Sequence, residues 1–321
     1  MRVLTGIQPS GDLHIGNYFG SIKQMVEAQA QNQTFAFIAN YHAQTSVSDG
    51  KRLAELTMQC ATDFLALGID PQKSVFWVQS DVKEVLELYW VLSSFTPMGL
   101  LERAHSYKDK MAKGIAANHS LFSYPVLMAA DILLFGSEVV PVGKDQIQHV
   151  EIARDIAIKF NNQYGDILTI PQFKVQEEVQ TVPGIDGQKM SKSYGNIVNI
   201  FGEEKSQLKT IKKIVTENVA MEEPKEFETC NVYNMAKLFL EGENLIALQE
   251  RYRRGGEGHG HFKVYLAEVM WEYFRDFREK REYFEAHQDE VREILQTGAK
   301  KAREAALPTM EKSRSVTGLK Y

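Results

Sequence analysis

Short apolar runs alternate with longer amphipathic segments through the first quarter of the chain. Residues 2–7 (RVLTGI), 33–40 (QTFAFIAN) and 74–79 (SVFWVQ) have the length and composition of buried strands. The segments between them, 17–30 and 53–68, carry apolar residues at helical spacing. Strands that alternate with helices predict a parallel sheet with right-handed crossovers and with helices on its faces.

The pattern then becomes helical until a strand-like run at 138–142 (EVVPV) returns to the sheet. We interpret the helical stretch, over about 95–137, as an insertion within the sheet. Beyond about residue 200 no strand is predicted, and the remaining segments have helical spacing. The sequence therefore predicts an α/β fold, with a Rossmann-like parallel sheet over 1–200 followed by an all-helical C-terminal domain over 201–321.

The composition narrows the class of protein. The chain has 321 residues, 44% of them hydrophobic and 25% charged, which suits one large or two modest globular domains. We expect no membrane segment and a cytoplasmic location, because no run approaches the roughly 20 apolar residues that span a bilayer and the start lacks a secretion signal. Cys60 and Cys230 stand far apart, which disfavours a disulfide framework and a structural zinc site.

The charge is uneven along the chain. A net charge of −5 argues against a protein covered by nucleic acid everywhere, yet a local basic face is compatible with it. Residues 299–320 hold six basic side chains against two acidic ones, and RYRRGG at 251–256 is a second basic cluster. Solvated helix ends, where cations favour the helix dipole, are the alternative interpretation of both.

The loop after the first strand reads GIQPSGDLHIGN, residues 6–17. Its three glycines let the backbone approach a ligand closely, and the N–H groups of the following helix favour an anion. The loop lacks the spacing of the dinucleotide fingerprint and of the P-loop, which disfavours both of those nucleotide-binding classes. His14 and Asn17 place an imidazole and an amide at the helix start. A capping or packing role for His14 is the alternative.

A second loop reads GIDGQKMSKSYGN, residues 184–196. Lys189 and Lys192 stand three residues apart between serines, in a segment bracketed by glycines that allow it to change shape. A solvated basic loop is the alternative interpretation of such a run. Together with the first loop, the two ammonium groups predict a site for a phosphate-bearing ligand.

These motifs carry a family resemblance. HIGN (14–17) resembles the His-Ile-Gly-His signature of class I aminoacyl-tRNA synthetases, and KMSKS (189–193) is identical to their second signature. Asn17 departs from the first signature, although an amide also donates hydrogen bonds to phosphate or ribose. GIQPSG (6–11), YPVLMAADIL (124–133) and VGKDQIQHVE (142–151) are similar to the bacterial tryptophanyl-tRNA synthetase family.

The resemblance implies a tryptophan–tRNA ligase, an enzyme that joins L-tryptophan to ATP and then transfers it to the 3′ end of tRNA(Trp). Lys189, Lys192 and His14 would be the catalytic residues. The two lysines would stabilise the charge that builds on the leaving pyrophosphate, because ammonium groups on flexible stems follow moving phosphate oxygens. Mg²⁺ is expected to bind through the triphosphate, with no ligand set from the protein alone.

The resemblance also assigns ATP contacts to the two loops, to the turn at 143–145 and to the insertion. A ribose contact through Asp145 is expected, while Lys108 and Lys110 alone would pass for surface charges. The full set is Gln8, Pro9, Ser10, Gly16, Asn17, Lys108, Lys110, Gly143, Lys144, Asp145, Val182, Lys189, Met190, Ser191, Lys192 and Ser193.

Asp131 is an ionisable residue flanked by Met, Ala, Ile and Leu, and its burial would need a partner. An indole offers one N–H donor and no acceptor, so a carboxylate matches it. Met128, one turn earlier on the same face, suits contact with an aromatic ring. An Asp that caps a neighbouring element is the alternative. The resemblance adds Tyr124, His42 and Gln146 to this pocket, with Gln146 near the ammonium of the substrate.

Three rivals remain open. A tyrosyl-tRNA synthetase shares the architecture, but a phenol both donates and accepts and therefore needs mixed partners. A metabolic nucleotidyltransferase would have no use for the helical domain and the basic C-terminal end. A non-catalytic RNA-binding paralogue is expected to have lost the lysines or the first loop. The resemblance further implies a homodimer and an anticodon-binding role for 201–321.

Overall fold

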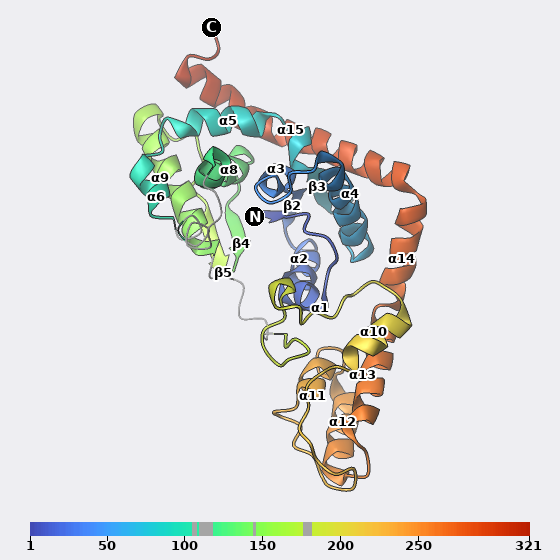
Figure 1. The fold of residues 1–321 in the computed structure, drawn as a ribbon. Coiled ribbons are helices and arrows are strands. Elements are labelled where there is room, and N and C mark those ends of the chain that lie inside the picture. Colours follow the sequence, from blue (N-terminus) through green and yellow to red (C-terminus); the bar gives the residue numbers. More distant parts are fainter. Residues whose placement is uncertain (105–107, 109–117, 144–145, 176–181) are drawn as a thin grey trace.

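The structure, a computed structural model, describes residues 1–104, 108, 118–143, 146–175 and 182–321. Its centre is a five-stranded parallel sheet in the order β3-β2-β1-β4-β5, as counted over the described residues (Figure 1). The strands are β1 (Arg2–Ile7), β2 (Gln33–Ile38), β3 (Ser74–Val78), β4 (Val139–Val142) and β5 (Gln172–Val175). The expected parallel sheet and its first four strands are thus confirmed.

Strand β5 was missed by the sequence analysis. It pairs in parallel with β4 at one edge of the sheet. Its first three residues, Gln172, Phe173 and Lys174, are exposed. A short edge strand with polar and exposed positions has no apolar run, so its pattern does not differ from that of a loop.

Helices connect the strands and cover both faces of the sheet (Figure 1). A continuous helical segment with a π-helical middle follows β1. Helices α5, α6 and α8 lie between β3 and β4; α6 and α8 fall within the predicted insertion, and α5 precedes it. The elements are α1 (Ile15–Asn17), η1 (Tyr18–Ile22), α2 (Lys23–Ala28), α3 (Asn40–Ala43), α4 (Gly50–Ala66), η2 (Gln79–Asp81), α5 (Glu84–Ser93), α6 (Met98–Glu102), α8 (His119–Leu134), α9 (Ile147–Tyr164) and η4 (Lys192–Tyr194).

From residue 201 onward every residue is described, and the regular elements of this stretch are all helices, as expected. Figure 1 shows α10 to α13 in a lobe at one end of the molecule, while α14 and α15 return alongside the sheet. The helices are α10 (Glu204–Ile211), α11 (Asn231–Ala236), α12 (Gly242–Arg254), α13 (His259–Tyr273), α14 (Arg275–Ala286) and α15 (Gln288–Thr317).

Side chains of strand β2 alternate between two hydrophobic cores. In β2, Ala36 and Ile38 belong to the core shared with α4 and with the helical lobe. Phe35 and Phe37 belong to the core shared with α5, α8 and α9. This alternation is the two-residue period of a strand that is buried on both faces. The carboxyl ends of the strands are therefore held between two packed layers.

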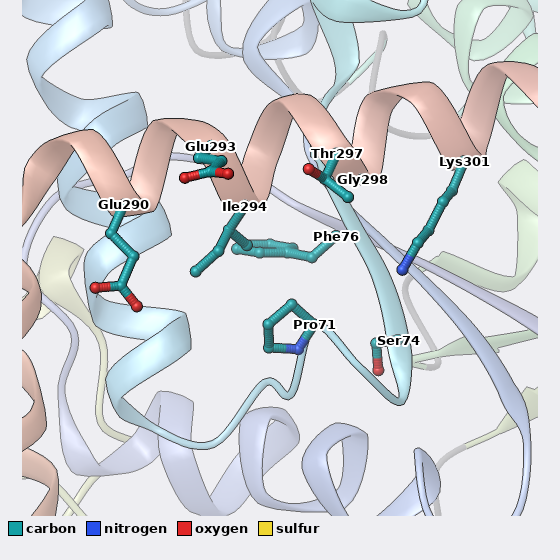
Figure 2. Close-up of a pocket in the computed structure, with 9 residues that line it drawn as sticks. All are labelled: Pro71, Ser74, Phe76, Glu290, Glu293, Ile294, Thr297, Gly298 and Lys301. Atoms are coloured by element: carbon teal, nitrogen blue, oxygen red, sulfur yellow. The ribbon is translucent and has the colours of Figure 1, made fainter.

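The last helix, α15, packs closely against strand β3. A Cβ atom added at Gly298 would lie 1.8 Å from the carbonyl oxygen of Phe76, so only glycine allows the two backbones to approach this far. Figure 2 shows Gly298 and Phe76 side by side above a small hollow of about 190 Å³. Leu295 belongs to the first core and Ala302 to the second.

Helix α15 therefore crosses the sheet edge and joins both cores. The proposed division of the chain at residues 200 and 201 stays a prediction. The packing adds that the end of the helical region lies against the sheet, not only within the helical lobe (Figure 1).

Candidate active site

A cavity of about 750 Å³ opens at the carboxyl ends of β1, β2 and β4. Parallel sheets bind ligands at this edge because the loops into the next helices converge there. Many expected site residues line it. They are Gln8, Ser10 and Asn17 from the first loop, His42 from α3, Tyr124, Met128 and Asp131 from α8, and Gly143 and Gln146 around the turn before α9. The tryptophan set of the sequence analysis thus comes together in one cavity with part of the ATP set.

Asp131 lies at the base of this cavity, with only 2% of its surface exposed. The Nε2 atom of His42 lies 2.8 Å from Oδ2, and the Nε2 atom of Gln79 lies 2.8 Å from each carboxylate oxygen. Burial raises the pKa of Asp131, and the hydrogen bonds from His42 and Gln79 act against that rise. The buried acid therefore has two side-chain partners within the protein, His42 from α3 and Gln79 from η2, and the expected contact with an indole N–H stays a prediction.

The rest of the expected tryptophan pocket surrounds this carboxylate. The ring of Tyr124 lies edge-on to that of His42, with 6.3 Å between the centroids. The hydroxyl of Tyr124 lies 3.1 Å from Nε2 of His149, a buried residue that the sequence analysis did not single out. Met128 and Asp131 both line the cavity, which confirms that they share one face of α8.

His14 and Asn17 form a reciprocal cap at the start of α1. The backbone N–H of Asn17 donates to Nδ1 of His14 (3.3 Å), and the backbone N–H of His14 donates to Oδ1 of Asn17 (3.1 Å). Burial, reinforced by the charge of Lys192, lowers the pKa of His14 to about 4. The imidazole is therefore neutral at physiological pH, with its proton on Nε2. The cap of the alternative interpretation is thus present, and the catalytic role of His14 stays a prediction. The cap leaves Nε2–H of His14 and the amide nitrogen of Asn17 as donors.

The two signature loops pack directly on each other. Residues 198–200 run antiparallel to the first loop: the N–H of Ile15 donates to Val198 O (3.0 Å), and that of Ile200 donates to Leu13 O (2.9 Å). A Cβ atom at Gly16 would come within 3.2 Å of the Cβ of Met190. The chain directly after the lysine-bearing loop is thus anchored to the first loop through backbone hydrogen bonds.

Lys192 points toward the first loop. Its ammonium donates to the carbonyl oxygen of Ser10 (2.9 Å) and lies 3.4 Å from the Ser10 hydroxyl. Lys192 is exposed, but the first loop displaces part of the water around its ammonium group and so lowers its pKa, while the carboxylates of Asp12 and Asp63 oppose that change. Lys189 is exposed. One of the two predicted ammonium groups therefore already lies at the rim of the cavity, beside a residue that lines it.

Asn196 holds the lysine loop in shape, and the sequence analysis gave it no role. It is 2% exposed. Its Oδ1 accepts from the N–H of Ser191 (2.8 Å), and its Nδ2 donates to Lys189 O (3.1 Å) and to Asp186 (2.8 Å). A Cβ atom at Gly184 would lie 2.3 Å from this amide nitrogen, so glycine makes room for the brace. No local pattern marks a buried amide within a polar loop.

Several other predicted ATP residues are described and do not line the cavity. Pro9, Val182 and Met190 are buried, while Lys108 and Ser193 are exposed. Val182 and Met190 meet through their backbones, since the N–H of Met190 donates to Val182 O (2.9 Å). Lys110, Lys144 and Asp145 lie outside the described residues, so nothing is said of their placement.

Two further properties concern metals and membranes. Within the described residues, no group of three or more His, Cys, Asp or Glu side chains is arranged to hold a metal ion. Among the described helices, none is both long enough and apolar enough to cross a membrane.

A Rossmann-like sheet, a capped glycine loop at its carboxyl edge and a lysine that reaches this loop define a nucleotide-binding α/β enzyme. The family model described as tRNA synthetases class I (W and Y) matches residues 1–291. The chain is 62% identical over 319 residues to tryptophan–tRNA ligase of Campylobacter jejuni, covering 99% of this chain and 100% of the relative. It is 48% identical to tryptophan–tRNA ligase of Rhodopirellula baltica, with both chains covered in full.

The comparison with solved structures supports the same family. A crystal structure of tryptophanyl-tRNA synthetase from Campylobacter jejuni, complexed with ADP and tryptophan, superimposes with a TM-score of 0.97 at 62% identity, over 99% of this chain and 100% of that one. The chain therefore belongs to the class I tRNA synthetases of the tryptophan and tyrosine family.

Proposed function

We propose that this protein is a tryptophan–tRNA ligase, which activates L-tryptophan with ATP and transfers it to the 3′ end of tRNA(Trp). The observation that carries the proposal is the buried carboxylate of Asp131 in the same cavity as the first loop. Relatives with that name at 62% and 48% identity over nearly the whole chain support it.

The indole would bind through the free acceptor position of Asp131. A carboxylate has about four lone-pair positions. Hydrogen bonds from Gln79 and His42 use one position on Oδ1 and two on Oδ2. One position on Oδ1 therefore remains, and an indole N–H is a single donor that fits it. A substrate without that donor would leave a buried acceptor unpaired, which is the strongest form of discrimination a binding site offers.

ATP would bind across the rim of the cavity. Ser10 and Asn17 line the cavity and offer donors on one side, with the buried His14 next to them at the start of α1. Lys192, with Lys189 nearby on the same loop, offers positive charge on the other side. The reaction is an in-line displacement at the α-phosphate, and negative charge grows on the leaving pyrophosphate. Mg²⁺ would enter with the triphosphate and supply further charge neutralisation, since it keeps most of its own water ligands.

Three parts of the proposal concern tRNA binding, the cellular location and the oligomeric state. Residues 201–321 would receive the anticodon of the tRNA, and the enzyme would work in the cytoplasm, where translation needs charged tRNA. It would also be a homodimer. In support of the dimer, Leu86 and Trp90 lie one turn apart on α5 and are 41% and 74% exposed, and Met98 at the start of α6 is 63% exposed. Exposed apolar side chains on neighbouring elements favour a protein interface.

The proposal is tested by exchange of labelled pyrophosphate into ATP in the presence of single amino acids. Tryptophan should support exchange with a kcat/KM on the order of 10³-fold or more above that of tyrosine, because a phenol leaves the free position of Asp131 without an indole N–H. Tyrosine as the better substrate would overturn the proposal. Exchange that does not depend on any amino acid would point to the metabolic nucleotidyltransferase class.

A further inference from the structure

Gln79 is a buried residue that contacts the carboxylate of Asp131 from outside the cavity. It begins η2, directly after β3, and is 1% exposed. It is not among the described residues that line the cavity, so it has no direct access to a bound substrate. Its amide nitrogen nevertheless lies 2.8 Å from both oxygens of Asp131.

The orientation of this amide is fixed from the other side. The backbone N–H of Tyr41 donates to Oε1 of Gln79 at 3.0 Å. A backbone N–H is only a donor, so the oxygen of the Gln79 amide must face Tyr41 and the NH₂ group must face Asp131. The neighbouring residues hold together the same junction, which is the contact between the segments that follow β2 and β3. Asn40 Nδ2 donates to the Ser80 hydroxyl (2.8 Å), and the N–H of Ser80 donates to Asn40 Oδ1 (3.1 Å).

We propose that Gln79 is a positioning residue for amino acid selection, which aims the carboxylate of Asp131 so that its free Oδ1 position faces the indole N–H. This inference rests on the proposed function. An amide donor suits the task because it fixes both oxygens without adding a positive charge, and the carboxylate therefore keeps its strength as an acceptor. A lysine or arginine at this place would compete with the indole for the same negative charge.

A purely structural role is the rival explanation, since Gln79 also joins the ends of β2 and β3. The two explanations differ in what they predict for substrates. A positioning residue affects only ligands that use the carboxylate, whereas a structural residue affects every ligand of the cavity. A tryptophan analogue in which sulfur replaces the indole N–H, β-(benzothiophen-3-yl)alanine, separates them because it has nearly the same shape and no donor.

The experiment compares Gln79→Met with the wild-type enzyme in pyrophosphate exchange. Methionine has a similar length and cannot hydrogen-bond with the carboxylate. We expect the KM for tryptophan to rise roughly tenfold or more, and the KM values for ATP and for the analogue to stay within about threefold, because only tryptophan donates to Asp131. The matched control is Ser80→Ala, which removes a contact of the same junction without touching Asp131 and should leave all three KM values unchanged.

A double substitution adds a second readout. If Gln79 acts through Asp131, Gln79→Met should add little to the loss already caused by Asp131→Asn, because the group that it positions has been removed. Fully additive losses, or an equal loss for tryptophan and for the analogue, would overturn the inference and leave the proposed function standing. Failure of the proposed function shows separately, as a preference of the wild-type enzyme for tyrosine.

Should Gln79→Met not fold, as judged by thermal unfolding, Gln79→Leu provides the same test. Leucine has a similar volume and no donor for Asp131. The same selective loss of tryptophan over the analogue is expected, and an unchanged ratio between the two substrates would contradict the inference.

Discussion

The two halves of the cavity are built differently. We call them the amino acid side, at Asp131, and the nucleotide side, at the lysine loop, after the ligands that we propose for them. On the amino acid side, Asp131 is 2% exposed and is held by side chains from α3 and η2. On the nucleotide side, Lys189 and Lys192 are exposed, and their loop is bounded by Gly187 and Gly195 with φ of 83° and 66°. Buried polar groups need fixed partners, whereas exposed charges are stabilised by water.

Under the proposed function, this difference would separate selection of the amino acid from the chemical step. Discrimination between side chains needs an acceptor that stays in one place, and the packed ends of β2 and β3 provide that. Displacement of pyrophosphate needs charges that follow the phosphate oxygens as they move, and a loop on the surface provides that. We therefore expect substitutions on the two sides to change different kinetic constants.

The largest effect is expected from Asp131→Asn. The amide keeps the volume but presents an NH₂ group to donors from Gln79 and His42, so tryptophan loses its acceptor and the pocket gains unpaired donors. The kcat/KM for tryptophan should fall on the order of 10³-fold, while the KM for ATP changes little. Pyrophosphate exchange at varied tryptophan and ATP concentrations measures both. A comparable rise in the KM for ATP would contradict the separation of the amino acid side from the nucleotide side.

A smaller loss is expected from Lys192→Ala. Removing one preorganised cation should slow adenylate formation about 10²-fold, because the charge on the leaving pyrophosphate loses a partner. Tryptophan affinity, measured by equilibrium binding, should stay the same. Lys209→Ala, at an exposed position of α10, is the matched control and should leave the rate unchanged. Equal losses of tryptophan binding and rate would show that Lys192 acts before the transition state.

The smallest effect concerns His14, which is 6% exposed and belongs to the nucleotide side. The unfolded chain protonates this residue near pH 6.5, whereas burial lowers the pKa in the folded state to about 4. Its contribution to stability is therefore complete above about pH 6.5 and falls as the pH drops toward 4.

The substitution His14→Asn keeps an acceptor for the cap and removes the titration. The free energy of unfolding of the wild-type protein, relative to this variant, should decrease on the order of 1 to 2 kcal/mol between pH 7.5 and pH 5. Urea unfolding at the two pH values measures it. Parallel pH dependence of the two proteins would show that His14 is not buried as the structure describes.

Much of the fold and part of the site could be predicted. Apolar runs with strand length gave four of the strands, because burial on both faces leaves a continuous hydrophobic signal. Asp131 and Met128 were identifiable as a pair because a lone acid in an apolar helix needs a partner. The lysine loop was found through its motif. Strand β5 was missed because it lies at the edge of the sheet and is polar.

Other residues had no local signal. Gln79 and Asn196 are glutamine and asparagine residues in a turn and in a loop, positions where such residues are ordinary. Gln79 matters because it contacts Asp131, which lies 52 residues further along the chain. Asn196 matters because the bend of the loop brings the N–H of Ser191 to its side chain. The contact of Gly298 with Phe76 is of the same kind, since nothing near residue 298 indicates which strand the helix will meet.

The sequence by itself determined the sheet, the helical insertion, the two signature loops and the acid that a substrate donor would meet, because each depends on residues that are neighbours along the chain. Only the tertiary structure decided how the carboxylate of Asp131 is oriented, which loop Lys192 contacts and where the last helix lies. These properties depend on hydrogen bonds and close backbone approaches between distant segments, and such contacts exist only after the chain has packed.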